Sequence, residues 1–174
     1  MSLEQAPART TCFPEPSAPV RLALMTWRLI RGGDPDALAE AAEGDDPPRP
    51  WAPDTCAEDM AQQVWQWCDD VALWVNREYA WRPAGLIPGC WPHHAHIARE
   101  LPVLACLHHA AAASNSPEPL EEWHRHSLPL FLDRLHSRLG EGTCVSGKHQ
   151  PWPAAARYDA AVRQSAAEGR EQQR

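Results

Sequence analysis

The sequence has almost no lysine and no stretch rich in positive charge. Lys148 is the single lysine among 174 residues, and the formal net charge is −7. The imbalance is concentrated in residues 31–59, which hold nine carboxylates and two arginines. Proteins that bind nucleic acids need clustered cations against the phosphates. The composition therefore disfavours a nucleic-acid partner and favours a protein partner.

The sequence also lacks the marks of export and of membrane insertion. Its first residues show no positively charged start followed by an apolar run. The longest strongly apolar run, 101–107, is far shorter than the about 20 residues that span a bilayer. We therefore expect a cytoplasmic protein without a membrane anchor. In that setting reduced thiols or metal ligands are favoured over disulfides for the six irregularly spaced cysteines, at positions 12, 56, 68, 90, 106 and 144.

Motifs typical of enzymes are missing as well. The sequence contains no GxSxG, HExxH, P-loop or GxGxxG pattern. A thiol nucleophile with its base is one interpretation of Cys144 and His149, but nothing marks an oxyanion hole or an orienting third group. We therefore expect no catalytic residues, no organic cofactor and a non-enzymatic protein.

What the sequence does contain is helical periodicity. Apolar residues from Met60 to Trp74 recur at 4-3-4-3 spacing and predict a helix from a Thr55/Glu58 capping box to about residue 81. No segment alternates with the period of a strand. We predict an all-α fold, a small helical bundle of about four main helices with a short N-terminal helical arm and long Pro/Gly loops. The further helices are expected over residues 20–31, 35–43, 92–113, 117–139 and 154–167.

The prolines and the composition suggest how these helices are divided. Pro102 should kink or divide its helix, and Pro129 should break or bend the next one. Asp34 is expected to cap the helix that Pro35 opens. The expected organisation is a disordered N-terminus (1–19), a helical acidic arm and linker (20–53), a helical domain (54–167) and a disordered tail (168–174).

Two Cys/His pairs have the spacing of metal ligands. Cys90-x-x-His93 and Cys144-x4-His149 each lie in or beside a predicted loop. Together they would form a Cys2His2 set, which suits a structural zinc ion. His94 is an alternative to His93. The competing interpretation is that Cys90 is a small buried apolar residue and that the histidines are ordinary side chains.

Tryptophan is the dominant aromatic residue, with nine Trp against two Tyr and two Phe. Trp67 and Trp74 lie on the predicted core stripe. Trp27 on the N-terminal helix, and Trp51 and Trp152 in loops, are candidates for partner binding, because tryptophan is a frequent anchor of interfaces. The loop tryptophans could instead cap the bundle.

One group of motifs resembles a known family. They are Trp74-Val75, Cys90-Trp91-Pro92-His93 leading into Ile97-Ala98-Arg99, Trp123-x-x-His126-x-x-Pro129 and Gly142-x-Cys144. In order and spacing they resemble an actinobacterial family of plasmid, phage and integrative-element genes that is classed as a domain of unknown function.

The resemblance covers roughly residues 60–150, by eye. It implies a mobile-element context and no activity, and it matches Cys90, His93, His126 and Cys144, so that His126 competes with His149 as a ligand. The chain departs from the family in having Cys-Trp-Pro in place of Trp-Cys-Pro, with fewer residues between Cys90 and His93.

Three functions follow as hypotheses. The first is a non-enzymatic accessory or interaction protein of a bacterial mobile element, with the acidic arm as its partner-binding part. The second is a DNA-associated regulatory factor using Arg125, Arg134 and Arg138, which the acidic balance disfavours. The third is a small metal-dependent hydrolase or nuclease, which would need an open coordination position at the Cys/His cluster.

Overall fold

The computed structural model describes residues 10–44, 46–80, 85–139, 144, 148–151 and 154–171, and every regular element in these ranges is helical. The predicted all-α class is confirmed. None of the described helices is both long and apolar enough to cross a bilayer. In chain order the elements are α1 (Ala18–Arg31), α2 (Pro35–Glu43), the turn η1 (Pro53–Thr55), α3 (Glu58–Glu78), the turn η3 (Trp91–His93), α4 (Ala95–Ala112), α5 (Glu118–Glu122), the π-helical turn η4 (Trp123–Ser127), α6 (Leu128–Leu139) and α7 (Ala155–Glu171).

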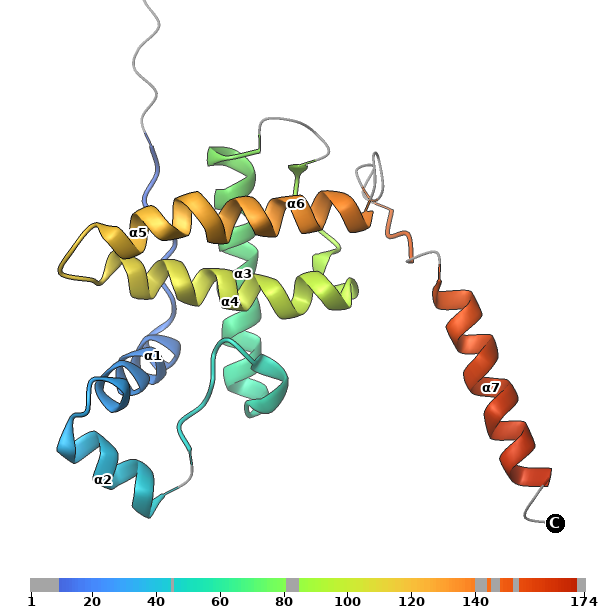
Figure 1. Cartoon of the computed structure of the whole chain (residues 1–174), viewed down its shortest axis with the longest axis horizontal. Helices are drawn as coiled ribbons and strands as arrows, with labels where there is room; N and C mark the ends of the chain where they lie inside the picture. Colours follow the sequence, from blue (N-terminus) through green and yellow to red (C-terminus); the bar gives the residue numbers. More distant parts are fainter. Residues whose placement is uncertain are drawn as a thin grey trace, which may run out of the picture.

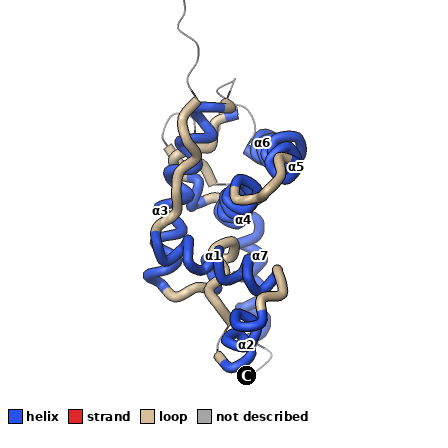
Figure 2. Tube along the Cα trace, turned by 90° about the vertical axis from the view of Figure 1, so that its left-hand side faces the viewer, coloured by secondary structure: helices blue, strands red, loops and turns tan. Residues whose placement is uncertain are grey.

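The helices form a hairpin crossed by one long helix. The chain reverses between α4 and α5, so α4 and the run from α5 through α6 lie antiparallel and side by side (Figures 1 and 2). α3 crosses this hairpin in Figure 1, and α1 and α2 lie together beside it. α7 stands apart from the other helices in the same view and reaches Glu171, beyond the predicted end at residue 167.

The core lies where α3 meets the hairpin. α3 contributes Val64, Trp67, Val71 and Val75, each at most 2% exposed. The first three belong to the 4-3-4-3 pattern that predicted this helix, and its other members, Met60 and Trp74, are partly buried against the core. From the hairpin, α4 contributes Ile97, Leu101 and Leu104. The opposite run contributes Trp123, Leu128, Phe131 and Leu135.

The N-terminal region is joined to this core more closely than its sequence suggested. Val20 of α1 is fully buried in the core cluster, so the predicted arm is partly a core element. Residues 1–9 lie outside the described residues. Residues 10–17, which were expected to be disordered, run along α3 and place the Phe13 ring against Trp67 and Trp74.

The capping signals in the sequence predicted the start of α2 correctly and the start of α3 wrongly. Asp34 caps α2 as predicted, with its Oδ1 accepting from the backbone N–H of Ala37 at 3.0 Å. The Thr55/Glu58 capping box is wrong. Thr55 belongs to η1, where its hydroxyl donates to the carbonyl of Ala52, and the helix begins after Ala57 with no side-chain cap. Pro53 starts a separate turn, and this turn uses the hydroxyl that the box required.

The internal prolines are accommodated without dividing the helices. α4 continues through Pro102, whose side chain is buried in the core. Pro129 is the second residue after the π-helical turn η4, and the chain remains helical from Glu118 to Leu139. A proline cannot donate to the carbonyl four residues before it and collides with that carbonyl in a regular helix. The wider turn of η4 confines the lost hydrogen bond and the steric conflict at Pro129 to one place in the helix.

A histidine side chain packs against this core. His108 of α4 is 7% exposed, stacks on Phe13 with ring centroids 3.7 Å apart, and meets Trp123 edge to face at 4.6 Å. Its Nδ1 has no hydrogen-bond partner. Burial, with smaller contributions from His124 and His109, lowers the pKa of His108 to about 4. The ring is therefore neutral at pH 7.

Acid should destabilise the fold through His108. Its pKa is lower in the folded chain than in the unfolded one, so its contribution is complete above about pH 6.5 and is lost as the pH falls towards 4. We expect H108F, which keeps the aromatic stack, to retain about 2 kcal/mol more of its unfolding free energy at pH 4.5 than the wild type does. Urea unfolding at pH 7 and 4.5 measures this. H136Q, at an exposed histidine, should follow the wild type, and equal pH dependence of H108F and wild type would contradict the assignment.

Candidate metal centre

Four metal-ligating side chains converge at one end of the hairpin. Cys90, His94, Cys144 and His149 place one potential ligand atom each within 4.8 Å of all the others. The first two precede α4 and the last two follow α6, so the cluster joins segments about fifty residues apart in sequence. Two of its members, His94 and Cys144, are buried at 5% and 3% exposure.

The first half of the cluster is positioned by α3. Asn76 holds the backbone of Ile87 from both sides, accepting from its N–H at 2.7 Å and donating to its carbonyl at 2.9 Å. Four residues further on, the indole N–H of Trp91 donates to Asp69 at 2.8 Å, and the Trp91 ring is 1% exposed. These contacts fix the chain on either side of the loop that carries Cys90.

A single tight turn then directs Cys90 and His94 to the same side. Cys90 directly precedes η3, and its carbonyl accepts from the N–H of His93 at 3.0 Å. His94 directly precedes α4, and its carbonyl accepts from the N–H groups of Ile97 and Ala98. With both backbones held, Cys90 Sγ lies 3.5 Å from His94 Nε2.

The second half of the cluster comes from the chain beyond α6. Cys144 Sγ lies 3.3 Å from His94 Nε2 and accepts from the backbone N–H of Gln150 at 3.2 Å. Cys144 has φ +63°, which makes it the one non-glycine residue with positive φ in the described part of the chain. Such strain costs of order 1 kcal/mol and persists where the surroundings demand it. His149 is exposed, with its ring centroid 4.8 Å from that of His94.

Two of the distances agree with a shared tetrahedral centre. Zinc lies about 2.3 Å from sulfur and about 2.0 Å from imidazole nitrogen, which puts neighbouring ligand atoms about 3.5 Å apart in a tetrahedron. Both sulfur-to-Nε2 distances at His94 match that spacing. A single imidazole nitrogen carries one hydrogen or one lone pair, so it cannot satisfy two thiols at once. A cation between them would satisfy all three groups.

The electrostatics suit a cation with thiolate and imidazole ligands. Burial, with smaller contributions from His149, His96 and His93, lowers the pKa of His94, which keeps the ring in the neutral form that coordinates metals. Burial and the neighbouring Cys144 thiol raise the pKa of Cys90, because two thiolates side by side repel each other. A divalent cation removes that repulsion by replacing the thiol protons.

Three of the four favoured ligands belong to the cluster, and His94, the alternative, takes the place of His93. His93 is exposed at the end of η3, whereas His94 starts the buried stripe that continues through Ile97 and Leu101. The amphipathic pattern of α4 was therefore the signal that distinguishes the two neighbours. His93 still lies close, with its ring centroid 5.3 Å from that of His149.

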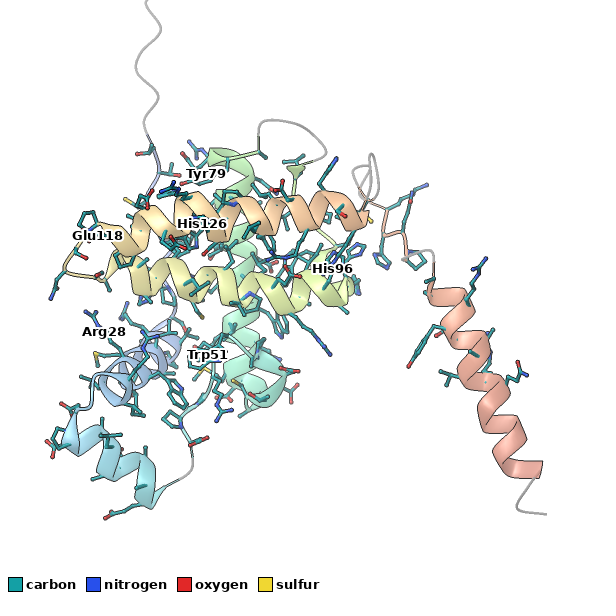
Figure 3. The ribbon with its side chains drawn as sticks, viewed as in Figure 1. Arg28, Trp51, Tyr79, His96, Glu118 and His126 are labelled. Atoms are coloured by element: carbon teal, nitrogen blue, oxygen red, sulfur yellow. The ribbon has the colours of Figure 1, made fainter. Side chains whose placement is uncertain are left out.

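The other alternative ligand, His126, is not part of the cluster. It is exposed on η4, with its Nε2 3.7 Å from a carboxylate oxygen of Glu122. Figure 3 shows it well along the hairpin from His96, which lies on α4 two residues after His94. His126 is separate from the cluster because η4 lies within the helical run from α5 to α6, whereas the cluster lies at the end of that run.

The tryptophans proposed for partner binding are engaged within the chain. The Trp27 and Trp51 rings meet edge to face at 5.5 Å, and Trp27 Nε1 donates to the carbonyl of Pro48 at 2.9 Å. They fasten α1 to the segment that precedes η1, and both remain half-buried. Trp152 lies outside the described residues.

Comparison of the chain with protein-family models, with curated proteins and with solved structures finds no match. The resemblance to mobile-element proteins therefore stays a prediction. The assignment of the site depends on its geometry.

Replacing each of the two neighbouring histidines by alanine, in separate variants, tests that geometry. We expect H94A to weaken Co²⁺ binding at least tenfold and to change the visible absorption of the tetrahedral Co²⁺ complex, because a buried ligand is lost. H93A should bind Co²⁺ like the wild type. Titration followed by absorption spectroscopy measures both. The reverse order of effects would show that His93 is the ligand.

Proposed function

We propose that the chain is a non-enzymatic interaction protein whose helical body is held together by one structural zinc ion. The observation that carries the metal assignment is the convergence of two thiols and two imidazoles, from separate segments, to within 4.8 Å. Zinc is favoured over other cations because soft thiolate and borderline imidazole ligands in a four-ligand set match its preferences.

The metal would close the open end of the helical hairpin. α4 and the run from α5 to α6 are joined covalently at one end by residues 113–117. At the other end α4 begins and α6 finishes, and Figure 1 shows these two helix ends side by side. Zinc bound by Cys90 and His94 on one side and by Cys144 and His149 on the other would tie those ends together. The ion would then add its binding free energy to the stability of the fold.

A structural role is favoured over a catalytic one by the ligand count. Catalytic zinc sites usually keep three protein ligands and leave one position for water or substrate. Here four protein side chains are available, and together they would fill a tetrahedron. Two grooves on the described surface lie elsewhere, one of about 310 Å³ between α1 and α2 and one of about 280 Å³ between α4 and α6. Neither is lined by a member of the cluster.

The DNA-binding alternative is weakened by the partners of its arginines. Arg134 and Arg138 both bind the carboxylate of Glu100, at 2.7 and 2.6 Å. Arg125 lies 3.5 Å from Glu121. Cations that are already paired release few counterions when they meet a phosphate backbone, so they contribute little to affinity. The acidic balance of the chain acts in the same direction.

The interaction role is supported by apolar side chains left on the surface. Leu22, Met25 and Leu29 of α1 are 43–59% exposed, and Leu107 of α4 and Leu130 of α6 are about half exposed beside the second groove. Grouped apolar side chains on helices are typical of contact surfaces. The setting of that role in a bacterial mobile element comes from the family resemblance alone.

Metal analysis of the purified protein tests the structural zinc. We expect about one zinc per chain, lost in C90S and in C144S and kept in C56S, whose thiol lies outside the cluster. Removing zinc with a chelator should lower the melting temperature by about 5–10 °C, the shift expected for a ligand present at about 100 times its Kd. Inductively coupled plasma mass spectrometry and thermal unfolding measure the two effects. A metal-free protein with an unchanged melting temperature would contradict the proposal.

A further inference from the structure

The segment that precedes α1 is held by α3 mainly through its backbone. The indole N–H of Trp74 donates to the carbonyl of Thr11 at 3.0 Å, and that of Trp67 donates to the carbonyl of Pro14 at 2.9 Å. At the two ends, the Thr11 hydroxyl donates to Glu78 at 2.6 Å and the Ser17 hydroxyl donates to Gln63 at 2.7 Å. The segment thus runs antiparallel to α3.

The spacing of these contacts is that of a polyproline II helix laid on an α-helix. The contacting residues of the segment, 11, 14 and 17, recur every three residues, which is one polyproline II turn of about 9 Å. Trp67 and Trp74 lie seven residues apart on α3, which is two α-helical turns or about 10.5 Å. The two repeats match closely enough for each indole to meet one carbonyl on the same side of the segment.

The sequence of the segment favours that conformation. A residue before proline is biased towards extended or polyproline II geometry, which applies to Phe13 and Glu15. Ser17 has φ −57° and ψ 160°, values close to polyproline II. Cys12 and Glu15, three residues apart, are exposed and form the outward side, and Pro16 is buried. The segment therefore enters the groove largely preorganised.

One aromatic side chain anchors the segment. The Phe13 ring meets Trp74 edge to face at 5.0 Å and Trp67 at 6.3 Å, and it stacks on His108 at 3.7 Å. Trp123 meets His108 edge to face at 4.6 Å and extends this aromatic cluster. The groove on α3 and α4 thus supplies an aromatic pocket and two indole donors, the combination by which proline-rich peptides are recognised elsewhere.

We propose that this groove is a recognition site for proline-flanked aromatic peptides of a partner protein, and that residues 11–16 occupy it in the free chain as a displaceable substitute. Indole-to-carbonyl hydrogen bonds do not depend on the side chains of the peptide, so a partner needs only the polyproline II form and an aromatic residue before a proline. Residues up to Pro16 can leave without unfolding α1, because Val20 holds that helix to the core. The assignment rests on the interaction role proposed above but uses none of the Cys/His cluster, so zinc binding and peptide binding fail separately.

A peptide added to the full chain tests the groove. The probe is the chain's own segment 10–17 as a synthetic peptide, with the substitution Cys12→Ser against oxidation. In the wild type the tethered segment competes at an effective concentration in the millimolar range. F13A removes the tethered anchor and should bind the peptide at least about tenfold more tightly than the wild type. Tryptophan fluorescence and isothermal titration calorimetry measure the affinity.

Matched variants separate recognition from adsorption to an apolar surface. In the F13A background, W74F keeps an aromatic ring but removes one indole donor, and it should weaken binding about fivefold. W65F, on the same helix but with its ring 5.5 Å from Trp91, should change nothing. A peptide in which alanine replaces its Phe13 should not bind. Circular dichroism checks each variant, and P14G replaces F13A if F13A loses helicity.

Three outcomes would overturn the proposal. The first is the absence of saturable peptide binding to the folded variant, and the second is equal binding with and without W74F. The third is a wild-type dimer in sedimentation velocity that free peptide dissociates, because the groove would then take the segment of a second copy and not that of a partner protein.

Discussion

The structure depends on one requirement of buried tryptophan, which is that its indole N–H must find an acceptor when the ring leaves water. In this chain the acceptors belong to other segments. Each such hydrogen bond therefore fastens two parts of the fold beside a buried or half-buried ring. The donors and acceptors are Trp27 with Pro48, Trp67 with Pro14, Trp74 with Thr11, Trp91 with Asp69 and Trp123 with Leu104.

The candidate metal centre follows from this requirement. Trp91 is anchored to Asp69 on α3, and it lies between Cys90 and His94 in sequence. Its burial fixes the tight turn that brings those two ligand atoms together. The antiparallel hairpin then returns the chain to the same place, where Cys144 adopts a strained backbone conformation to face His94. Packing in the core thus positions Cys90 and His94, and the hairpin brings Cys144 and His149 to them.

The two proposed sites lie in different parts of the molecule and use different chemistry. The Cys/His cluster is at the end of the hairpin where α4 begins and α6 ends. The peptide groove is on α3, near the opposite end of α4, where His108 lies one turn from the last residue, Ala112. α4 takes part in both.

Much of the architecture was predictable because helical order is local. The apolar spacing from Met60 to Trp74 predicted α3, and Asp34 with Pro35 predicted the start of α2. The Cys and His residue types and their short spacing indicated where ligands would gather. Local signals failed where two local structures competed, as at Thr55, whose hydroxyl serves a separate turn and not the cap of α3.

By itself the sequence determined the helical class, the positions of most helices and the chemical nature of the candidate site, since these depend on propensities and on residue types. The stripe of α4 indicates that His94 and not His93 faces inward, but only the tertiary structure brings His94 to Cys144 and His149, because the antiparallel hairpin returns the chain to that place. The tertiary structure also decided that a proline-rich segment without apolar periodicity is ordered. That order comes from indole donors on α3, more than fifty residues away in sequence.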